Sequence, residues 1–326
     1  MVRILTRQDV QKALPMAQAI EAVRDAFVQL SAGQADVPLR TALDVPRRNG
    51  VTLFMPAYLS VDDQMALKIV SVYDDNPDKG LPLIHALVVV VDAKTGAPTA
   101  IMDGTYLTAL RTGAASGAAT EALARPEARV AAIFGAGAQG RTQLEAVCAV
   151  RSIEEAWIYD VESARAGRYA DEMSDLLDVN VCVARMPAQA VRSADVICTA
   201  TTSSSPVFDD ADVQPGTHIN AIGAYTPEMQ EIPPHTVLRA RVVIDHREAA
   251  LAEAGDLLIP IDRGLMTPEH ISAELGEVVA GDRPGRESSD EITLFKSVGV
   301  AVQDVATAAA VLEAAQTTGL GTDVAL

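Results

Sequence analysis

The sequence is short of cysteine, of basic residues and of long apolar runs, and each shortage argues against a class of protein. Three cysteines among 326 residues, with no CxxC pair and no cluster of histidines, give no sign of a disulfide framework or a zinc site. Lys and Arg number 26 against 44 Asp and Glu, so the formal net charge of -18 repels nucleic acid and anionic membrane surfaces. No stretch approaches the roughly 18 apolar residues of a membrane span, and the N-terminus lacks the apolar core of a signal peptide. We expect a cytoplasmic protein that binds no metal, nucleic acid or membrane.

Aromatic residues are also scarce, at 4% of the chain, while alanine and valine abound. This composition favours many small, closely packed contacts between helices and strands, and it suits an α/β fold. Hydrophobic residues make up 49% and charged residues 21%, which is ordinary for a globular protein with a sizeable core and excludes disordered, collagen-like and coiled-coil chains. At about 100 to 200 residues per domain, the length predicts two domains, or one domain interrupted by another.

The first third of the chain has the pattern of helices followed by an antiparallel sheet. Apolar residues recur at helical spacing over about the first 30 residues, and we expect two short helices, capped by Thr6 and split near Pro15. Residues 38–91 change to short β-rich runs separated by Gly, Pro, Asn and Asp, which indicates an antiparallel sheet. The turn DAKTG and the run PTAIMD, within 92–103, extend it by a hairpin. Residues 107–124 then return to an alanine-rich helix.

From residue 129 onward the pattern becomes an alternation of strands and helices. The β runs are RVAAIF (129–134), EAWIYD (155–160), VNVCVA (179–184), VICTAT (196–201), HINAIG (218–223) and RVVIDH (241–246). Repeated βα units predict a parallel, doubly wound sheet. An acidic, leucine-rich helix follows Arg247, then a strand over 291–299 and a final helix over 300–317. That helix has no further strand to cross to, so we expect it to return to the N-terminal region and make the first domain discontinuous.

The strongest motif is the glycine-rich loop Gly135-Ala136-Gly137-Ala138-Gln139-Gly140. It follows the apolar run 130–134 directly, opens a helical pattern, and precedes a second β run that ends in Asp160 at the separation of about 20 residues expected for a ribose-binding acid. In a dinucleotide site, Gly135 permits the tight turn, Gly137 lets the pyrophosphate approach, and Gly140 lets the helix pack on the strand. Asp160 would accept hydrogen bonds from the adenosine ribose and favour NAD over NADP, because a carboxylate repels a 2′-phosphate. The alternative is a glycine turn in a domain that binds no nucleotide.

Two later predicted strands, VICTAT and HINAIG, end in small or polar residues. They end at the edge where a doubly wound sheet presents the carboxyl ends of its strands to a ligand. A hydroxyl-rich loop, TATTSSS, begins at Thr199, and the run HINAIG ends at Gly223. We expect the nicotinamide half of the site to be lined here by Thr199, Ala200, Thr201, Ser203 and Gly223. An ordinary polar loop remains the alternative for each hydroxyl.

Seven segments carry a wider resemblance. They are LFMPAY (53–58), LKIVSVYDDNP (67–77), MDGTYLTALRTGAAS (102–116), FGAGAQG (134–140), TATTSSSPVF (199–208), NAIGAYTPEMQE (220–231) and LFKSVGVAVQD (294–304). Through them the sequence resembles the ornithine cyclodeaminase and mu-crystallin family over essentially its whole length. The resemblance implies a discontinuous α+β substrate and dimerisation domain at residues 1–115 and 302–326. It also implies an NAD(P)-binding Rossmann domain with a doubly wound parallel sheet at residues 116–301.

The resemblance also assigns a cofactor, an assembly and several residues. The cofactor is NAD(H), with NADP(H) left open, and the partner is a second copy of the chain that pairs through the β-rich segment 51–103. Thr112 resembles the family residue that meets the cofactor phosphates. Within FKSVG, which resembles the element that closes over the nicotinamide, Val298 and Gly299 are the candidate contacts. From the residues alone this segment is simply a strand that leads into a helix.

Three basic residues occupy family positions that hold a substrate carboxylate: Arg40 in VPLRT, Lys68 in ALKIV and Arg111 in ALRTG. A guanidinium can hold a carboxylate through two hydrogen bonds, and a local cluster of cations attracts a small anion even in an acidic protein. His85 matches a histidine found near the substrate in part of the family. Its alternative is a hydrogen-bonded histidine of the core.

One position departs from the cyclodeaminase pattern. Where those enzymes carry an aspartate that does acid/base work on the substrate amines, this sequence has Tyr225, in GAYTPEMQE. A phenol with an ordinary pKa near 10 is neutral at pH 7 and does not replace a carboxylate base. Glu231 matches a family glutamate present alongside that aspartate, so it does not obviously compensate.

These observations favour an NAD(P)H-dependent reductase of a small cyclic imino acid, such as 1-pyrroline-2-carboxylate or 1-piperideine-2-carboxylate. Lys68 and Tyr225 are the candidate catalytic residues, with Tyr225 shaping the pocket rather than acting as a base. The alternatives are an amino-acid dehydrogenase of the alanine type, ornithine cyclodeaminase itself, and a non-catalytic ligand-binding protein like mu-crystallin.

Overall fold

The computed structural model describes residues 1–325 and divides into two compact units. Unit 1 comprises Met1–Arg111 together with the chain from Val300, and unit 2 comprises Thr112–Gly299. The expected boundaries, after residue 115 and before residue 302, lie a few residues further along the chain. The first boundary falls inside the uninterrupted helix α3, Gly104–Leu123, which contains no proline and whose internal glycines, Gly113 and Gly117, do not interrupt it. The α/β class with a parallel sheet in one unit is confirmed.

Unit 1 is built on an eight-stranded sheet in the order β16-β1-β7-β6-β5-β4-β2, with β3 also paired to β4. Its strands are β1 (Val2–Leu5), β2 (Ala35–Asp36), β3 (Thr41–Val45), β4 (Gly50–Leu59), β5 (Gln64–Tyr73), β6 (Ile84–Asp92), β7 (Pro98–Asp103) and β16 (Thr322–Val324). Strands β4 to β7 pair antiparallel in sequence order, which confirms the predicted sheet and hairpin. Among the described strands of this unit, only β1 and β7 pair in parallel.

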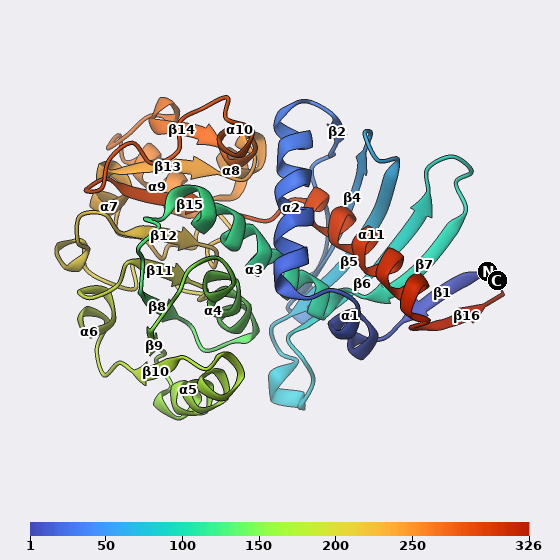
Figure 1. Cartoon of the computed structure of the whole chain (residues 1–326), viewed down its shortest axis with the longest axis horizontal. Helices are drawn as coiled ribbons and strands as arrows, with labels where there is room; N and C mark the ends of the chain where they lie inside the picture. The colour runs from blue at the N-terminus through green and yellow to red at the C-terminus, as the bar shows by residue number, and fades with distance from the viewer. Residues whose placement is uncertain (326) are drawn as a thin grey trace. The chain divides into compact units, whose positions relative to one another are not determined.

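Three helices cover one face of this sheet. They are α1 (Arg7–Ala13), α2 (Met16–Ser31) and α11 (Ala301–Thr318). Thr6 caps α1 as predicted, in a capping box with Asp9, and Pro15 separates the first two helices. The final helix returns to the N-terminal unit, where it packs on α2, β4 and β5 (Figure 1). On the opposite face the side chains of β5 are half-exposed, as the alternating burial along that strand shows.

Unit 2 is an eight-stranded parallel sheet in the order β10-β9-β8-β11-β12-β15-β13-β14. Its strands are β8 (Val130–Phe134), β9 (Glu155–Tyr159), β10 (Asn180–Val183), β11 (Val196–Thr199), β12 (His218–Ala221), β13 (Ala240–Ile244), β14 (Ile271–Glu274) and β15 (Ile292–Lys296). Strand β8 is central and the order reverses beside it, which is the topology that places a ligand at the carboxyl ends of the strands.

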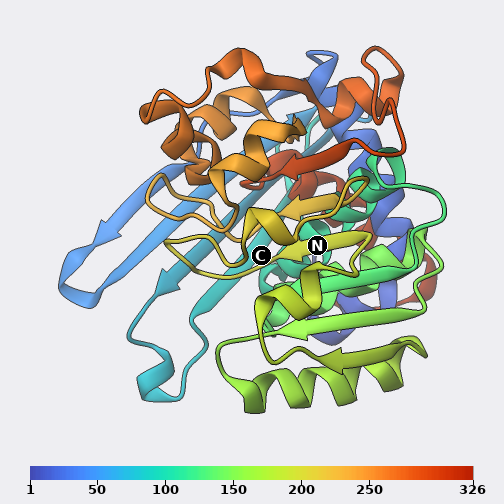
Figure 2. The same cartoon turned by 90° about the vertical axis from the view of Figure 1, so that its left-hand side faces the viewer.

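The connecting helices of unit 2 are α4 (Ala138–Val150), α5 (Ser163–Leu177), α6 (Pro187–Val191), α7 (Pro234–Arg239), α8 (Arg247–Glu253), α9 (Gly255–Asp262) and α10 (Leu275–Ala280). Figure 2 shows α5 running beside the edge strand β10, against which it packs. Single-turn 3-10 helices lie at Pro46–Arg48, Pro77–Lys79, Asp210–Asp212 and Pro268–His270. Among the described residues, no helix combines the length and apolar character needed to cross a membrane.

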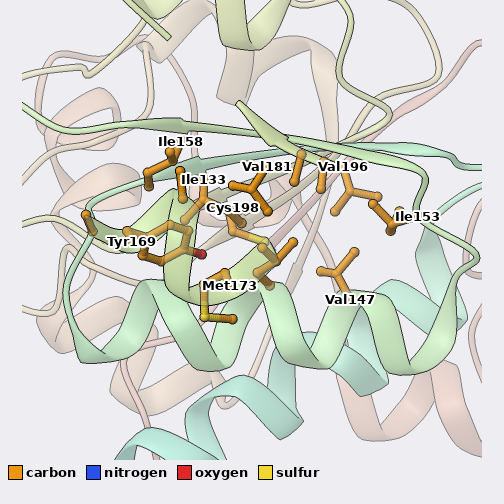
Figure 3. Close-up of a cluster of buried hydrophobic side chains, with 14 of the residues drawn as sticks. Ile133, Val147, Ile153, Ile158, Tyr169, Met173, Val181, Val196 and Cys198 are labelled. Atoms are coloured by element: carbon orange, nitrogen blue, oxygen red, sulfur yellow. The ribbon is translucent and has the colours of Figure 1, made fainter. Parts of the chain in front are cut away.

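A cluster of buried side chains holds α4 and α5 against the sheet (Figure 3). It contains many alanines and small aliphatic residues, and Tyr169 is its one aromatic member. Burying a side chain such as Ile133 or Met173 contributes roughly 1.5–3 kcal/mol. The hydroxyl of Tyr169 donates a 2.8 Å hydrogen bond to the carbonyl of Gly140, so the core is tied directly to the glycine-rich loop.

The sequence reading missed several short elements. Strands β1, β2, β3 and β16 have few residues or exposed side chains, so they lack the apolar alternation that marks a strand. Strand β14 and helix α10 were also missed, and the single helix expected after Arg247 is two helices that meet at Ala254. All three cysteines are free. Cys198 is buried, and Cys148 and Cys182 are partly buried.

Candidate functional site

The glycine-rich loop of unit 2 has contacts that only glycine permits. Gly135 has a φ of +100°, and a Cβ there would lie 2.6 Å from the carbonyl oxygen of Ala200. A Cβ on Gly140 would lie 2.1 Å from the carbonyl oxygen of Gly135. These two glycines therefore allow β8, the loop after β11 and the start of α4 to pack closely.

Gly137 has a different environment, with open space where its side chain would stand. It is the N-cap of α4, no side chain caps that helix, and Gly137 and Ala138 are exposed. The first N–H groups of a helix bind anions well when no side chain occupies them. The loop therefore fits the pyrophosphate of a dinucleotide.

Asp160 lies at the end of β9, beside this loop. Its Oδ2 accepts a 2.8 Å hydrogen bond from the Ala136 amide, and its Oδ1 accepts a 2.9 Å bond from the Glu162 amide. The guanidinium of Arg165 donates to both oxygens, at 3.0 and 2.7 Å. Burial alone would raise the pKa of Asp160, but these donors outweigh it and lower the pKa below its ordinary value, so the group is a carboxylate. Asp160, the candidate ribose acid, thus lies beside the glycine-rich loop and already has an arginine partner.

Glu231 fixes the two loops expected to line the nicotinamide. Its Oε1 accepts from the amide and hydroxyl of Thr201, at 2.6 and 2.7 Å. Its Oε2 accepts from the Thr199 hydroxyl at 2.8 Å and from the amides of Gly223 and Ala224 at 2.7 and 3.1 Å. The carboxylate thus ties the loop after β11 to the loop after β12.

This arrangement corrects the expectation that the hydroxyls of the loop after β11 face a ligand. The side chain of Thr199 is fully buried, and both threonine hydroxyls donate to Glu231. The hydroxyl of Ser203 donates to the carbonyl of Ser205 at 2.6 Å. A loop that uses its hydroxyls in this way is held rigid by them, and its backbone is the part left to meet a ligand.

Two more buried charges lie behind Glu231. Asp256 accepts from the amides of Glu231 and Ile232 at 2.7 and 2.9 Å, and from the ammonium of Lys296 at 2.9 Å. Asp256 and Lys296 are completely buried. Burial raises the pKa of Glu231 and the Asp256 carboxylate raises it further, yet all the partners found for its oxygens are donors, so Glu231 is held as the carboxylate.

The FKSVG segment is fixed by a third buried carboxylate. Oδ2 of Asp245 accepts from the Ser297 hydroxyl at 2.7 Å and from the amides of Val298 and Gly299, both at 2.9 Å. Gly299 has a φ of +81°, which favours glycine. The amide donors of Val298 and Gly299 are therefore occupied within the protein.

Unit 1 gathers the predicted basic residues around an aspartate. The ammonium of Lys68 lies 2.8 Å from Oδ2 of Asp304, and Nε of Arg111 donates to Oδ1 of the same carboxylate at 3.0 Å. The guanidinium of Arg111 also donates to Oε1 of Gln303. All four side chains are buried, Lys68 being only 1% exposed. The two cations outnumber the single anion, so the cluster has a net positive charge.

The electrostatics of this cluster centre on Lys68. Burial lowers the pKa of Lys68, the positive charge of Arg111 lowers it further, Asp304 opposes both, and Arg40 adds a smaller lowering, to a final value of about 7. Arg40 directly precedes β3, which pairs with β4, and β4 pairs with β5, the strand that carries Lys68; Arg40 is half-buried. An incoming carboxylate would stabilise the charged lysine, and the three predicted basic residues form one candidate anion site.

The structure also places His85, Tyr225 and Thr112, which were predicted to contact the substrate or the cofactor. His85 lies on β6, paired with Ser71, whereas Lys68 is paired with Val88, so His85 and Lys68 face opposite sides of the sheet. His85 is exposed and does not join the cationic cluster. Tyr225, in the loop after β12, is 37% exposed. Thr112 is buried on α3, and its carbonyl accepts a 3.3 Å hydrogen bond from the Gln143 amide.

Comparison with known proteins identifies a family over almost the whole chain. Residues 2–319 match the model of the ornithine cyclodeaminase/mu-crystallin family. The chain belongs to this family. It is 38% identical, over 98% of both chains, to a Delta(1)-pyrroline-2-carboxylate reductase of Bacillus cereus.

Solved structures of family members have the same fold. The Delta(1)-pyrroline-2-carboxylate reductase of Thermococcus litoralis, in complex with NADH and L-proline, superposes with a TM-score of 0.96 at 44% identity, over 99% of this chain and 100% of that one. An archaeal alanine dehydrogenase dimer with bound NAD superposes with a TM-score of 0.93 at 38% identity, over 100% of this chain and 99% of that one.

Sequence reasoning missed buried acidic residues in each unit that hold the candidate site residues of that unit. They are Asp245, Asp256 and Asp304. The neutral residue Gln303, which contacts Arg111 beside Asp304, was missed as well. Glu231 was named from the sequence, but no function was predicted for it. A signal was available for Asp304, since Gln303 and Asp304 are polar residues within the apolar repeat of the final helix. Their partners lie far away in the sequence, so the signal indicates burial of a polar pair without identifying its target.

Proposed function

We propose that this chain is an NAD(H)-dependent reductase that converts a small cyclic imino acid to the amino acid, namely 1-pyrroline-2-carboxylate to proline or 1-piperideine-2-carboxylate to pipecolate. The observation that carries the proposal is the buried cluster of Lys68 and Arg111 around Asp304, with its net positive charge. Two relatives over the full length, from Bacillus cereus and Thermococcus litoralis, are Delta(1)-pyrroline-2-carboxylate reductases, which supports the choice of substrate.

The substrate carboxylate binds to the cations of unit 1. Lys68 and Arg111 carry eight N–H donors between them, more than the lone pairs of Asp304 and the Gln303 oxygen can accept, so donors remain for a ligand. Arg40 supplies a third positive charge. A carboxylate held by several donors places the adjacent imine carbon in one orientation, which is the main requirement for transfer to that carbon.

The cofactor, when bound, supplies the hydride that adds to the imine carbon. The glycine-rich loop and the start of α4 hold its pyrophosphate, Asp160 serves its adenosine ribose, and the backbone around Ala200 and Gly223 lines its nicotinamide half. The nitrogen of a protonated imine keeps its proton and takes the C=N electron pair, so no protein base is required. Tyr225 is therefore not needed as a base.

The test is a direct assay with two arms. Purified protein is mixed with 1-pyrroline-2-carboxylate and NADH while the NADH absorbance is followed, and in parallel with ornithine and NAD while proline is measured. We expect NADH to be consumed in the first arm and no proline to form in the second. Proline from ornithine would contradict the prediction that Tyr225 cannot replace the aspartate of the cyclodeaminases. If neither 1-pyrroline-2-carboxylate nor 1-piperideine-2-carboxylate caused NADH oxidation, the reductase assignment would be overturned.

An alanine-type dehydrogenase is the second candidate, favoured by the 38% identity to the archaeal alanine dehydrogenase. Both reactions transfer hydride to or from a carbon that bears nitrogen and a carboxylate. Alanine with NAD separates them, because a cyclic imine reductase that lacks an open-chain route gives no NADH from alanine. Turnover of alanine that exceeds turnover of the cyclic imine would favour this second function.

The proposed assembly is a homodimer that pairs through the sheet of unit 1. On the face opposite the helices, half-exposed apolar side chains come from four neighbouring strands: Phe54, Leu67, Ile69, Leu87, Val89 and Ile101. A contiguous apolar patch of this kind marks an interface, and the archaeal relative is a dimer. Light scattering should give about twice the chain mass of 34.3 kDa, and a mass equal to that of one chain would contradict the dimer.

A further inference from the structure

Asp304 bridges the two buried cations of unit 1 with separate oxygens. Its Oδ2 lies 2.8 Å from the ammonium of Lys68, and its Oδ1 accepts a 3.0 Å hydrogen bond from Nε of Arg111. The side chain of Asp304 is 2% exposed and that of Lys68 is 1% exposed, so little solvent screens their charges. A single carboxylate therefore fixes the spacing between the ammonium and the guanidinium.

Helix α11 gives this carboxylate a defined place. Asp304 lies in the first turn of α11, where the positive end of the helix dipole stabilises a negative charge. The preceding residue, Gln303, accepts from the guanidinium of Arg111 through its side chain, and its backbone carbonyl accepts from the Thr307 hydroxyl at 2.7 Å. The start of α11 thus binds Arg111 at two adjacent positions, one charged and one neutral.

Lys68 depends on this anion for its charge. Burial lowers the pKa of Lys68 and the positive charge of Arg111 lowers it further, whereas Asp304 raises it. Of the charged groups that act on this ammonium, Arg111 and Arg40 are positive and Asp304 is negative. Without the Asp304 carboxylate, burial and both arginines would favour the neutral amine of Lys68, which carries no charge to attract a substrate carboxylate.

We propose that Asp304 is a positioning residue of the carboxylate site, which keeps Lys68 in its charged form and holds it at a fixed spacing from Arg111. The proposal rests on the proposed function, since it concerns the residues that bind the carboxylate in that reaction. Asp304 acts through the two cations and needs no contact with the substrate. The substrate carboxylate then meets a pair of charges whose orientation is already set.

The first experiment measures the charge of Lys68 directly. Lysine labelled with ¹³C at Cε is incorporated into the protein, the pH is varied, and the NMR signal of Lys68 is identified by its absence from Lys68→Met. We expect a pKa of about 7 for Lys68 in the natural protein. In Asp304→Asn the titration should lie roughly 1–3 pH units lower, the shift for the loss of an adjacent opposite charge.

Two further variants complete this titration. Asp304→Ser, which is smaller and also uncharged, should shift the titration of Lys68 in the same direction, and it replaces Asp304→Asn if that variant does not fold. Gln303→Met is the matched control, because it removes the neutral contact to Arg111 from the neighbouring position. Lys68 should titrate at the same pH in Gln303→Met as in the natural protein.

The second experiment follows the consequence for the reaction. It measures kcat/KM for 1-pyrroline-2-carboxylate with NADH as a function of pH. Asp304→Asn should lose roughly fivefold or more at pH 7, because a half-charged lysine becomes at most about one-tenth charged, and the loss should shrink as the pH falls. A change that merely loosened the fold would lower kcat/KM at every pH. Introduced into Lys68→Arg, Asp304→Asn should leave the shape of the pH profile unchanged, because a guanidinium stays charged without a counter-ion.

The outcomes separate this proposal from the function on which it rests. The proposal is overturned if Lys68 titrates at the same pH in Asp304→Asn and the natural protein, or if Gln303→Met shifts the titration equally far. It is also overturned if Lys68 of the natural protein is already neutral at pH 6. The NMR titration uses neither imine nor NADH, so it can show the role of Asp304 in a protein that reduces neither cyclic imine. In that case the charge-holding role of Asp304 stands and the reductase proposal falls.

Discussion

Each unit buries a cluster of three formal charges, and the two clusters are opposite in sign and in completeness. Unit 1 holds Lys68, Arg111 and Asp304, and unit 2 holds Glu231, Asp256 and Lys296. In unit 2 the two carboxylates accept from backbone amides, hydroxyls and one ammonium. In unit 1 the cations have more donors than the neighbouring oxygens can accept. We call the cluster of unit 2 complete because every oxygen of its two carboxylates already accepts from the protein, whereas the net positive charge of the unit 1 cluster is suited to an anionic ligand.

The largest effect should come from breaking the complete cluster of unit 2. Asp256→Asn removes the counter-charge of the fully buried Lys296 and leaves an unpaired ammonium in the core. Removal of one partner of a buried ion pair costs about 3–5 kcal/mol. We expect a loss of that size in the free energy of unfolding, measured by urea denaturation. The double variant Asp256→Asn with Lys296→Met should recover part of it, and a single variant as stable as the natural protein would contradict the role given to this pair.

The corresponding change in unit 1 should affect activity far more than cofactor binding. Lys68→Met keeps the length of the side chain and removes the charge that holds the substrate carboxylate. We expect kcat/KM for the cyclic imine to fall by about 100-fold, the loss expected from one charge-assisted contact with a carboxylate and its orientation. NADH affinity should be unchanged, because the glycine-rich loop belongs to unit 2. The control is Lys12→Met, an exposed lysine of the same unit, and equal losses in both variants would argue against a carboxylate site.

A smaller effect is expected at the edge of the complete cluster, where it meets the cofactor loops. Glu231→Gln places an amide NH2 opposite one set of donors, either the two of Thr201 or the group formed by Thr199, Gly223 and Ala224. A buried donor left unsatisfied costs about 1–3 kcal/mol. NADH binding should weaken roughly tenfold, the lower end of that range, as the two loops lose their fixed spacing. Glu228→Gln, three residues away and exposed, is the matched control and should bind NADH normally.

The smallest change is expected in the pH dependence of the unit 1 cluster. The pKa of Lys68 is lowered to about 7, mainly by burial and by Arg111. In the free enzyme the ammonium is therefore lost as the pH rises through about 7, and kcat/KM should decline above that pH. In the unfolded chain Lys68 keeps this proton up to the ordinary lysine pKa. Between the lowered pKa of the folded protein and that ordinary pKa, unfolding therefore takes up a proton. In this range the contribution of Lys68 to the free energy of unfolding rises with pH.

Lys68→Arg tests the assignment of that decline, because a guanidinium stays charged over the whole range. The decline above pH 7 should disappear in this variant, whatever its absolute rate. A profile in Lys68→Arg that declines at the same pH as in the natural protein would assign the titration to another group. Arg40, Arg111 and Asp304 are the charged groups that act on the Lys68 ammonium.

Local patterns explain what could be read from the sequence. The Thr6 cap, the glycine-rich loop and the βα alternation each lie within a few residues of the features that define them, so they were predicted. The position of Asp160 at the end of a strand follows from the local pattern, but its partner Arg165 is recognisable only once a helix begins at Ser163 and turns the guanidinium back. The placement of a single residue in the helix decides whether the carboxylate is free or paired.

The charged clusters could not be predicted from local patterns, because their members lie far apart in the chain. Asp304 and Lys68 belong to different ends of the sequence and meet only when the final helix packs on β5. Thr199 was expected to face a ligand, and the structure buries it against Glu231, from the loop after a different strand. Contacts of this kind depend on the register between elements, which hydrophobic spacing does not specify.

The division of the chain into units also bears on the order in which the protein is made. Residues 112–299 leave the ribosome as one continuous stretch, so unit 2 can fold as soon as it has been synthesised. Unit 1 begins earlier and must wait, because α11 brings Gln303 and Asp304 to it only after unit 2 has been synthesised. Until then Lys68 and Arg111 lack their counter-charge and the sheet lacks a helix that covers it. The N-terminal part of the nascent chain is thus the part expected to occupy chaperones longest.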